Sequence, residues 1–294
     1  MTRPEPAIAF LPHGNKIGGK LSAKPLDELS WPLGMPDRLT GKRLCDLESH
    51  DHLIVMPNTL THFRLNFGTR ARISMAVAEP SVVHKKHLML LRLTYRRFFR
   101  VLTHNEGLLA AIPNAVFVPF GMTYVPNWRD LEIRKTKMTS LIASNLRDQV
   151  GHRLRHTVAD WVRDTGQDVD LLGRGYAPFD EKSDGLAPYY YSIVIENCRE
   201  PNYFSEKLID AVFCETVPIY WGCPNIDRFI DPDGLILCES EDDIKRAVGR
   251  VSVADYNERL AKIRAMKPQL ERYSDYDRSA AEAIRDVLNR QTGH

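Results

Sequence analysis

Apolar residues in the first half of the chain come in short runs that alternate with turn residues. Each run is bounded by polar residues, as expected of buried strands in a parallel sheet. Residues 82–101 are rich in Leu, Arg and Lys, which is typical of a helix or a helix followed by a loop. The expected strands of this half are residues 7–11, 52–56, 73–78 and 115–118.

The second half alternates strands with helices. We expect strands at residues 139–143, 169–172, 191–195, 217–220 and 235–237, helices at 151–164 and 205–214, and a mostly helical chain from 242 onward. Such alternation predicts a doubly wound parallel sheet, which binds ligands at the carboxyl ends of its strands.

A polar, charged segment of poor periodicity at residues 126–138 indicates a domain boundary. For 294 residues, two domains are the natural expectation. We therefore predict an N-terminal domain of residues 1–133 and a C-terminal domain of residues 134–294 that ends in a helical tail.

Composition excludes little, since 43% apolar and 27% charged residues are ordinary for a globular protein. The net charge of +2 gives no overall reason for binding nucleic acid, and no matching motif is present. The locally basic residues 85–100 fit a solvated helix face, or attraction to an anionic acceptor or lipid surface. Peripheral membrane contact therefore stays open.

Five cysteines without C-x-x-C spacing predict free thiols in a cytosolic protein rather than a metal site. The first 14 residues lack the apolar segment of a signal peptide, and no window has the ~18 apolar residues of a membrane helix. We expect a cytoplasmic protein. The loop HGNKIGGK at residues 13–20 lacks phosphate-loop spacing and is expected to be a flexible turn.

One segment combines residues suited to an anion. The strand predicted at 191–195 delivers Glu196 and Asn197 to its carboxyl end, and a helix follows with Glu206 and Lys207 in its first turn. A cation there opposes the helix dipole at a cost of ~0.3–1 kcal/mol, which a bound anion would reverse. A carboxylate such as Glu206 can accept hydrogen bonds from ribose hydroxyls. The set suits a nucleoside diphosphate sugar, but a surface Glu–Lys pair beside a strand-capping Asn fits the spacing equally well.

The sequences YYYSIVIENC, YFSEK and VPIYWG follow in order at residues 189–198, 203–207 and 217–222. Their order and spacing, with ten residues from Glu196 to Glu206, resemble the donor-binding signature of the α-1,3/4-fucosyltransferases. The resemblance covers residues 139–237 and is weak in the N-terminal half.

This resemblance implies a GT-B fold, in which two Rossmann-like doubly wound domains flank a cleft that holds the active site. The N-terminal domain would bind a glycan acceptor, such as a surface polysaccharide or lipopolysaccharide. The C-terminal domain would bind GDP-fucose and release GDP. The transfer would invert the anomeric centre without an essential metal or other cofactor. We accordingly expect Asp168 and Asp170, spaced like a metal-binding pair, to form part of a turn.

The resemblance also implies the donor contacts. Glu206 would hold the ribose and Lys207 the phosphates. A phosphate-binding arginine is expected after Ser144 and Asn145, where the sequence offers two. We favour Arg155, which places apolar residues three and seven positions later, over Arg153. The remaining expected donor residues are Glu196, Asn197 and Tyr203.

Inverting transfer needs a carboxylate that takes the proton of the acceptor hydroxyl. The base of the family precedes a proline after a strand of the N-terminal domain, and Glu79 is the nearest match. The alternative is an ordinary strand-end carboxylate.

Two positions depart from the signature: Tyr190 replaces a lysine and Cys198 replaces a serine. Transfer from another nucleotide sugar, or nucleotide-sugar binding without catalysis, therefore stays open.

Overall fold

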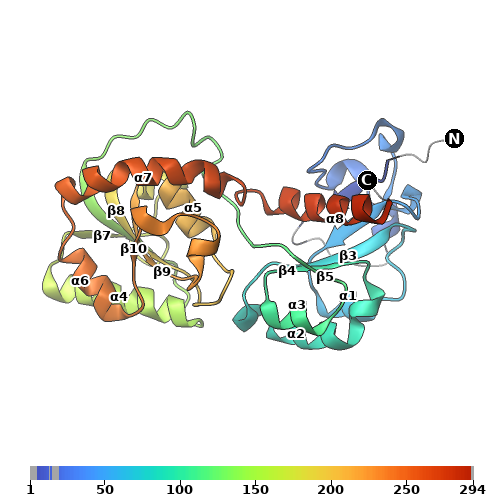
Figure 1. Cartoon of the computed structure of the whole chain (residues 1–294), viewed down its shortest axis with the longest axis horizontal. Helices are drawn as coiled ribbons and strands as arrows, with labels where there is room; N and C mark the ends of the chain where they lie inside the picture. The colour runs from blue at the N-terminus through green and yellow to red at the C-terminus, as the bar shows by residue number, and fades with distance from the viewer. Residues whose placement is uncertain (1–4, 13, 15–19, 293–294) are drawn as a thin grey trace. The chain divides into compact units, whose positions relative to one another are not determined.

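Two parallel five-stranded sheets organise the chain (Figure 1). This computed structural model describes residues 5–12, 14 and 20–292. The chain divides into one unit of Met1–Pro119 with Tyr276–His294 and a second of Phe120–Asp275. The loop predicted at residues 13–20 lies almost wholly outside the described residues.

The first sheet has the sequential order β1-β2-β3-β4-β5. Its strands are β1 (Ile8–Phe10), β2 (His52–Val55), β3 (Arg72–Val77), β4 (Val101–Thr103) and β5 (Ala115–Phe117). The connecting helices are α1 (Thr59–Phe63), α2 (Ser81–Thr94) and α3 (Glu106–Ala111). Each new strand is added on the same side of the one before it. Because crossovers between parallel strands are right-handed, these helices lie on one face of the sheet, as Figure 1 shows.

The predicted strands of this half are present, but β4 was missed. The prediction extended one helical region to residue 101, whereas α2 ends at Thr94 and a 3₁₀ turn, Tyr95–Arg97, follows it. A buried run of three residues directly after a helix is too short for its period to be recognised.

The predicted domain limits need correction, because the C-terminal helix α8 (Tyr276–Thr292) belongs to the first unit and not to the second. It packs on β1, on the opposite face of the sheet from α1, α2 and α3 (Figure 1). The ring of Tyr276 meets that of Phe10 edge-on at 6.3 Å, and Ala280 and Ile284 are fully buried. The first boundary falls at residues 119/120 rather than 133/134. An apolar stripe predicts that a helix buries one face, but not which sheet covers it.

The second sheet has the order β10-β9-β8-β6-β7. The chain adds β7 on one side of β6 and then returns to place β8 on the other side, so the winding reverses between β6 and β8. This unit is doubly wound as predicted, whereas the first sheet has no such reversal. Its strands are β6 (Lys137–Ile142), β7 (Val169–Leu172), β8 (Tyr189–Ile195), β9 (Val217–Trp221) and β10 (Ile236–Leu237).

Helices cover both faces of this second sheet (Figure 1). Helices α4 and α6 contact each other on one face, and α5 and α7 contact each other on the opposite face. The helices are α4 (Val150–Thr165), α5 (Glu206–Phe213), α6 (Glu241–Val248) and α7 (Val253–Glu271). The five cysteines are free, and all but Cys45 are buried.

Candidate functional site

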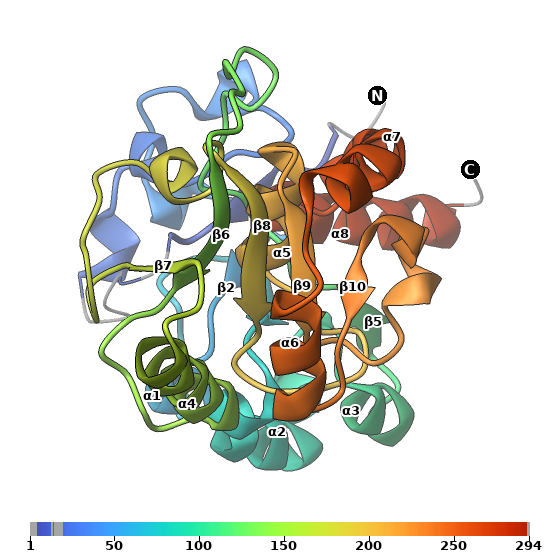
Figure 2. The same cartoon turned by 90° about the vertical axis from the view of Figure 1, so that its left-hand side faces the viewer.

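The reversal of winding creates a crevice at the carboxyl ends of β6 and β8, which lie side by side in Figure 2. In doubly wound sheets this is the position where ligands bind. A cavity of about 290 Å³ lies there. It is lined by Ile142, Ser144, Leu146, His152, Arg155, Lys182, Leu186, Ser192, Ile193, Val194, Ile195, Asn197 and Lys207.

Glu196 lies behind this cavity rather than in it. Its side chain is fully buried and accepts hydrogen bonds from the backbone N–H of Ser205 at 2.8 Å and from its hydroxyl at 2.6 Å. Burial raises the pKa of Glu196, although Lys207 opposes the shift. A Cβ at Gly222 would come within 2.6 Å of the Glu196 Cγ, so only glycine fits there. Glu196 therefore positions the start of α5 and lies outside the cavity lining, and its direct contact with a donor stays a prediction.

The first turn of α5 carries a partly buried ion pair. The Lys207 Nζ lies 2.8 Å from the Glu206 Oε1 and 3.8 Å from the Glu196 Oε2. Burial lowers the pKa of Lys207, but Glu206 and Glu196 outweigh it and the pKa ends above its usual value. Burial likewise raises the pKa of Glu206, and Lys207 reverses that shift. Both groups are charged. These carboxylates supply part of the compensation that the sequence attributed to a bound anion alone.

Helix α4 begins at the cavity and approaches β8 closely. The Gly151 N–H donates to the Asn197 carbonyl at 2.9 Å, and a Cβ on Gly151 would lie 1.8 Å from the Glu196 carbonyl oxygen. A side chain at this position would push the helix away from the strand. The orphan N–H groups and the positive dipole end of a helix N-terminus favour an anion.

The structure distinguishes the two candidate arginines. Arg155 is buried, and its Nε and Nη2 donate to the Ile195 carbonyl at 2.9 and 2.7 Å. Its Nη2 also donates to the Asn197 Oδ1 at 2.9 Å. Arg153 is exposed, and its Nη1 donates to the Asp148 carbonyl at 2.8 Å. Only Arg155 lines the cavity.

Two further residues of the cavity were not identified in the sequence. His152 is buried, and its Nδ1 lies 2.7 Å from the Asp148 Oδ1. Lys182 comes from the 3₁₀ turn Lys182–Gly185, in the connection between β7 and β8. Its Nζ makes no hydrogen bond within the described part of the chain. Burial lowers the pKa of Lys182, against the opposing effect of Asp210 and Glu206. Neither residue belongs to a local motif, so no sequence signal marked them.

The charge of the cavity follows from its lining. Arg155, Lys182 and Lys207 contribute cationic groups, and none of the lining residues is Asp or Glu. Together with the N-terminus of α4, these cations form a site suited to a phosphorylated ligand.

Two other predicted donor residues, Glu206 and Tyr203, and the two departures from the family signature lie outside this lining. Tyr203 is buried, with its ring stacked on Phe120 at 6.2 Å. The ring of Tyr190 meets that of Tyr256 at 4.9 Å, and Cys198 is buried. The substitutions at Tyr190 and Cys198 therefore leave the cavity lining unchanged.

Glu79 lies where the sequence placed it, after the carboxyl end of β3 and before Pro80, the N-cap of α2. Its side chain is half-buried. It belongs to the first unit, whereas the cavity belongs to the second.

Asp170 does not lie in a turn as predicted, because it is the second residue of β7. Its Oδ2 accepts a hydrogen bond from the Tyr189 hydroxyl at 2.6 Å and pairs with the Lys137 Nζ at 2.8 Å. These partners are the first residues of β8 and β6, so the group lies at the amino ends of the strands. This edge of the sheet is opposite to the one that carries the cavity.

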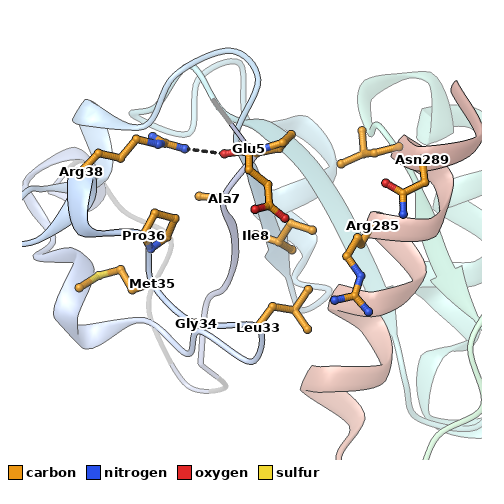
Figure 3. Close-up of a pocket in the computed structure, with 12 residues that line it drawn as sticks. Glu5, Ala7, Ile8, Leu33, Gly34, Met35, Pro36, Arg38, Arg285 and Asn289 are labelled. Atoms are coloured by element: carbon orange, nitrogen blue, oxygen red, sulfur yellow. Dashed lines mark hydrogen bonds between the residues drawn. The ribbon is translucent and has the colours of Figure 1, made fainter. Parts of the chain in front are cut away.

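The first unit has a larger cavity, of about 520 Å³, beside the amino end of β1 (Figure 3). Arg38, Arg285 and Asn289 contribute polar groups to it. Arg38 donates to the Glu5 carbonyl at 3.3 Å and is paired with Asp51. Parallel sheets bind ligands at their carboxyl edge, so this cavity is not the candidate site.

Comparison with known solved structures supports the fold. The alignment with a solved α1,3-fucosyltransferase covers 82% of this chain and 79% of that one, with a TM-score of 0.55 and 16% sequence identity. For a solved α1,3-fucosyltransferase with GDP-fucose, the coverage is 94% and 93%, the TM-score 0.51 and the identity 16%. These likenesses show the fold, which is the GT-B fold of glycosyltransferases.

The sequence of the second unit matches one family. Residues 133–262 match the model of the glycosyltransferase family 10 (fucosyltransferase) C-terminal domain. The α-(1,3)-fucosyltransferase FucT of Helicobacter pylori is 36% identical over 55 residues, which are 19% of this chain. The match spans only 12% of the length of that enzyme.

Proposed function

We propose that this protein is an inverting fucosyltransferase, which transfers fucose from GDP-fucose to a hydroxyl of a glycan acceptor. The observation that carries the proposal is the cationic cavity at the reversal of the second sheet, inside the segment that matches family 10. A solved structure of the same fold holds GDP-fucose, which supports this choice of donor.

The donor site would work through its charges. The diphosphate would lie at the N-terminus of α4, next to Lys207, Lys182 and the Arg155 Nη1, which makes no hydrogen bond to any described residue. Asn197, already held by Arg155, would fix the position of the donor. Glu206 would accept hydrogen bonds from the ribose hydroxyls. Tyr203 would support this site from behind, since it is buried.

The chemical step would need one base and one stabilised leaving group. We propose that the Glu79 carboxylate takes the proton of the acceptor hydroxyl while the oxygen of that hydroxyl attacks the anomeric carbon of fucose. The bond from that carbon to the diphosphate oxygen breaks, and GDP leaves with the electron pair. The cations of the cavity would stabilise the negative charge that develops on the leaving oxygen. These groups belong to the chain, so we expect activity to persist in EDTA.

A donor comparison tests the proposal. Calorimetry with GDP-fucose, GDP-mannose and UDP-glucose should show tightest binding of GDP-fucose, and incubation should release fucose slowly to water. Preference for another nucleotide sugar would replace the proposed donor within the same fold. Tight binding of GDP-fucose without release or transfer of fucose, across a panel of glycan acceptors, would instead indicate a binding protein.

A further inference from the structure

Exposed apolar side chains gather on two neighbouring helices of the first unit. On α1 and the residues that follow it, Leu60 is 64% exposed and Leu65 is 94% exposed. On α2, Leu93 is 82% exposed. With exposed cations on the same helices they form what we term the α1–α2 surface. It comprises Leu60, Phe63, Leu65, Val82, Lys85, Lys86, Met89, Arg92, Leu93, Arg96 and Arg97.

The spacing along α2 gives this surface its pattern. Val82, Met89 and Leu93 stand at positions i, i+7 and i+11, so they form one stripe along the helix. Lys85 and Arg92 flank the stripe on one side, and Lys86 lies on the other. The opposite side of α2 buries Leu91 and His84. The helix therefore has apolar residues on both faces, and only one face is covered.

Helix α1 extends the stripe sideways. The His62 Nε2 lies 2.9 Å from the His87 Nδ1, and the Lys86 Nζ donates to the Thr59 hydroxyl at 3.0 Å. Arg97 donates to the Arg64 carbonyl, which ties the following loop to the end of α2. Figures 1 and 2 both show α1 and α2 along the same border of this unit. Leu60, Phe63 and Leu65 thus lie beside the α2 stripe.

The charge of this region is strongly one-sided. Residues 59–100 hold nine Lys and Arg against a single acid, Glu79, which gives +8. The whole chain carries +2, so the remaining residues carry −6. The α1–α2 surface itself holds five of these cations and no acid. Exposed cations around an apolar stripe are typical of helices that lie on anionic membrane surfaces.

We propose that the α1–α2 surface docks on an anionic lipid bilayer. Its apolar side chains would enter the boundary between headgroups and acyl chains, while the flanking Lys and Arg would face the lipid phosphates. The contact would be peripheral, since no helix in residues 5–12, 14 and 20–292 is long and apolar enough to cross a bilayer. The proposal rests on neither the donor nor the reaction.

The pattern argues against other occupants. A second copy would bring the five cations of one α1–α2 surface against the five of the other, which is unfavourable. Nucleic acid would be matched by the cations but would leave Phe63, Met89 and Leu93 without an apolar environment. An anionic bilayer satisfies both the charge and the apolar stripe.

Vesicle flotation tests the proposal. The protein should bind vesicles of phosphatidylcholine with phosphatidylglycerol, bind pure phosphatidylcholine weakly, and dissociate as NaCl rises from about 0.1 M to about 1 M. In K85Q/R92Q, two cations are lost, and partitioning should fall about thirtyfold. In M89S/L93S, binding should also fall, but salt should still weaken what remains.

A matched control removes one apolar and one cationic side chain of the second unit in L237S/K262Q, which should bind vesicles like the wild type. GDP binding and the thermal midpoint should be unchanged in all three variants, which separates this test from that of the donor site. Absence of binding to anionic vesicles, or equal binding by all variants, would overturn the proposal. So would sedimentation showing a dimer that M89S/L93S dissociates, or a fluorescent DNA duplex bound more tightly than the vesicles.

Discussion

The two sheets of this protein have the same number of parallel strands but differ in winding, and their functional residues differ accordingly. The second sheet reverses between β6 and β8, and its cavity collects cations from α4, α5 and the β7–β8 connection. The first sheet adds its strands in one direction, and its candidate base follows a single strand. A reversal gathers residues that are distant in the sequence, whereas a sequential sheet offers isolated positions at the ends of its strands.

The strongest test of this comparison changes the first unit alone. E79Q should reduce fucose transfer by about 10²–10⁴-fold, because a positioned base contributes that much to proton transfer. GDP affinity should stay within about twofold, since Glu79 and the cavity belong to different units. Turnover and calorimetry on the same preparation measure both. Near-normal turnover would remove Glu79 from the role of base.

Within the second unit, the two arginines of α4 offer a matched pair. R155Q should weaken GDP binding about 10–100-fold, as expected for the loss of a charge-assisted hydrogen bond of about 1.5–3 kcal/mol. R153Q should change GDP affinity less than twofold, because that side chain is exposed and outside the cavity. The thermal midpoint must be recorded, because Arg155 also holds the Ile195 carbonyl. Equal effects of both substitutions would contradict the assigned geometry.

From the lowered pKa of Lys182 we expect donor binding to depend on pH. Burial lowers its pKa, and the charged groups around it are Asp210, Glu206, Lys207 and Arg155. A bound diphosphate favours the protonated lysine, so binding takes up a proton and affinity falls as pH rises through this lowered pKa.

K182M should weaken GDP-fucose binding about tenfold at neutral pH and remove the fall of affinity with rising pH. GDP-fucose is the suitable probe, because its diphosphate lacks the terminal phosphate group that titrates near pH ~6. An unchanged profile in K182M would assign the titration to another group, such as Asp210, whose pKa burial raises to about 7.

The smallest effect is expected at the departure from the family signature. Y190K restores the lysine of the signature, but residue 190 packs on Tyr256 and does not line the cavity. Affinities for GDP-fucose and GDP-mannose should each change less than about twofold, as measured by calorimetry. A switch in donor preference would show that this position influences the site through contacts that the cavity lining does not include.

Sequence reasoning succeeded where residues act locally. The position of Glu196 and Asn197 at the end of β8 and of Glu206 and Lys207 in the first turn of α5 both followed from strand and helix signals a few residues apart. It did not predict the contact of Glu196 with Ser205. A carboxylate next to Asn197 in the sequence points to the other side of the strand end and binds Ser205 instead of lining the cavity.

The sequence by itself predicted the strands other than β4, the family 10 match and the position of Glu196 and Asn197 at the carboxyl end of β8, because these depend on short-range periodicity and spacing. Tertiary structure alone decided the rest. The choice of Arg155, the entry of Lys182 and the docking of α8 on the first sheet depend on which strands become neighbours. Strand order arises from packing between residues far apart in the chain, and no local pattern encodes it.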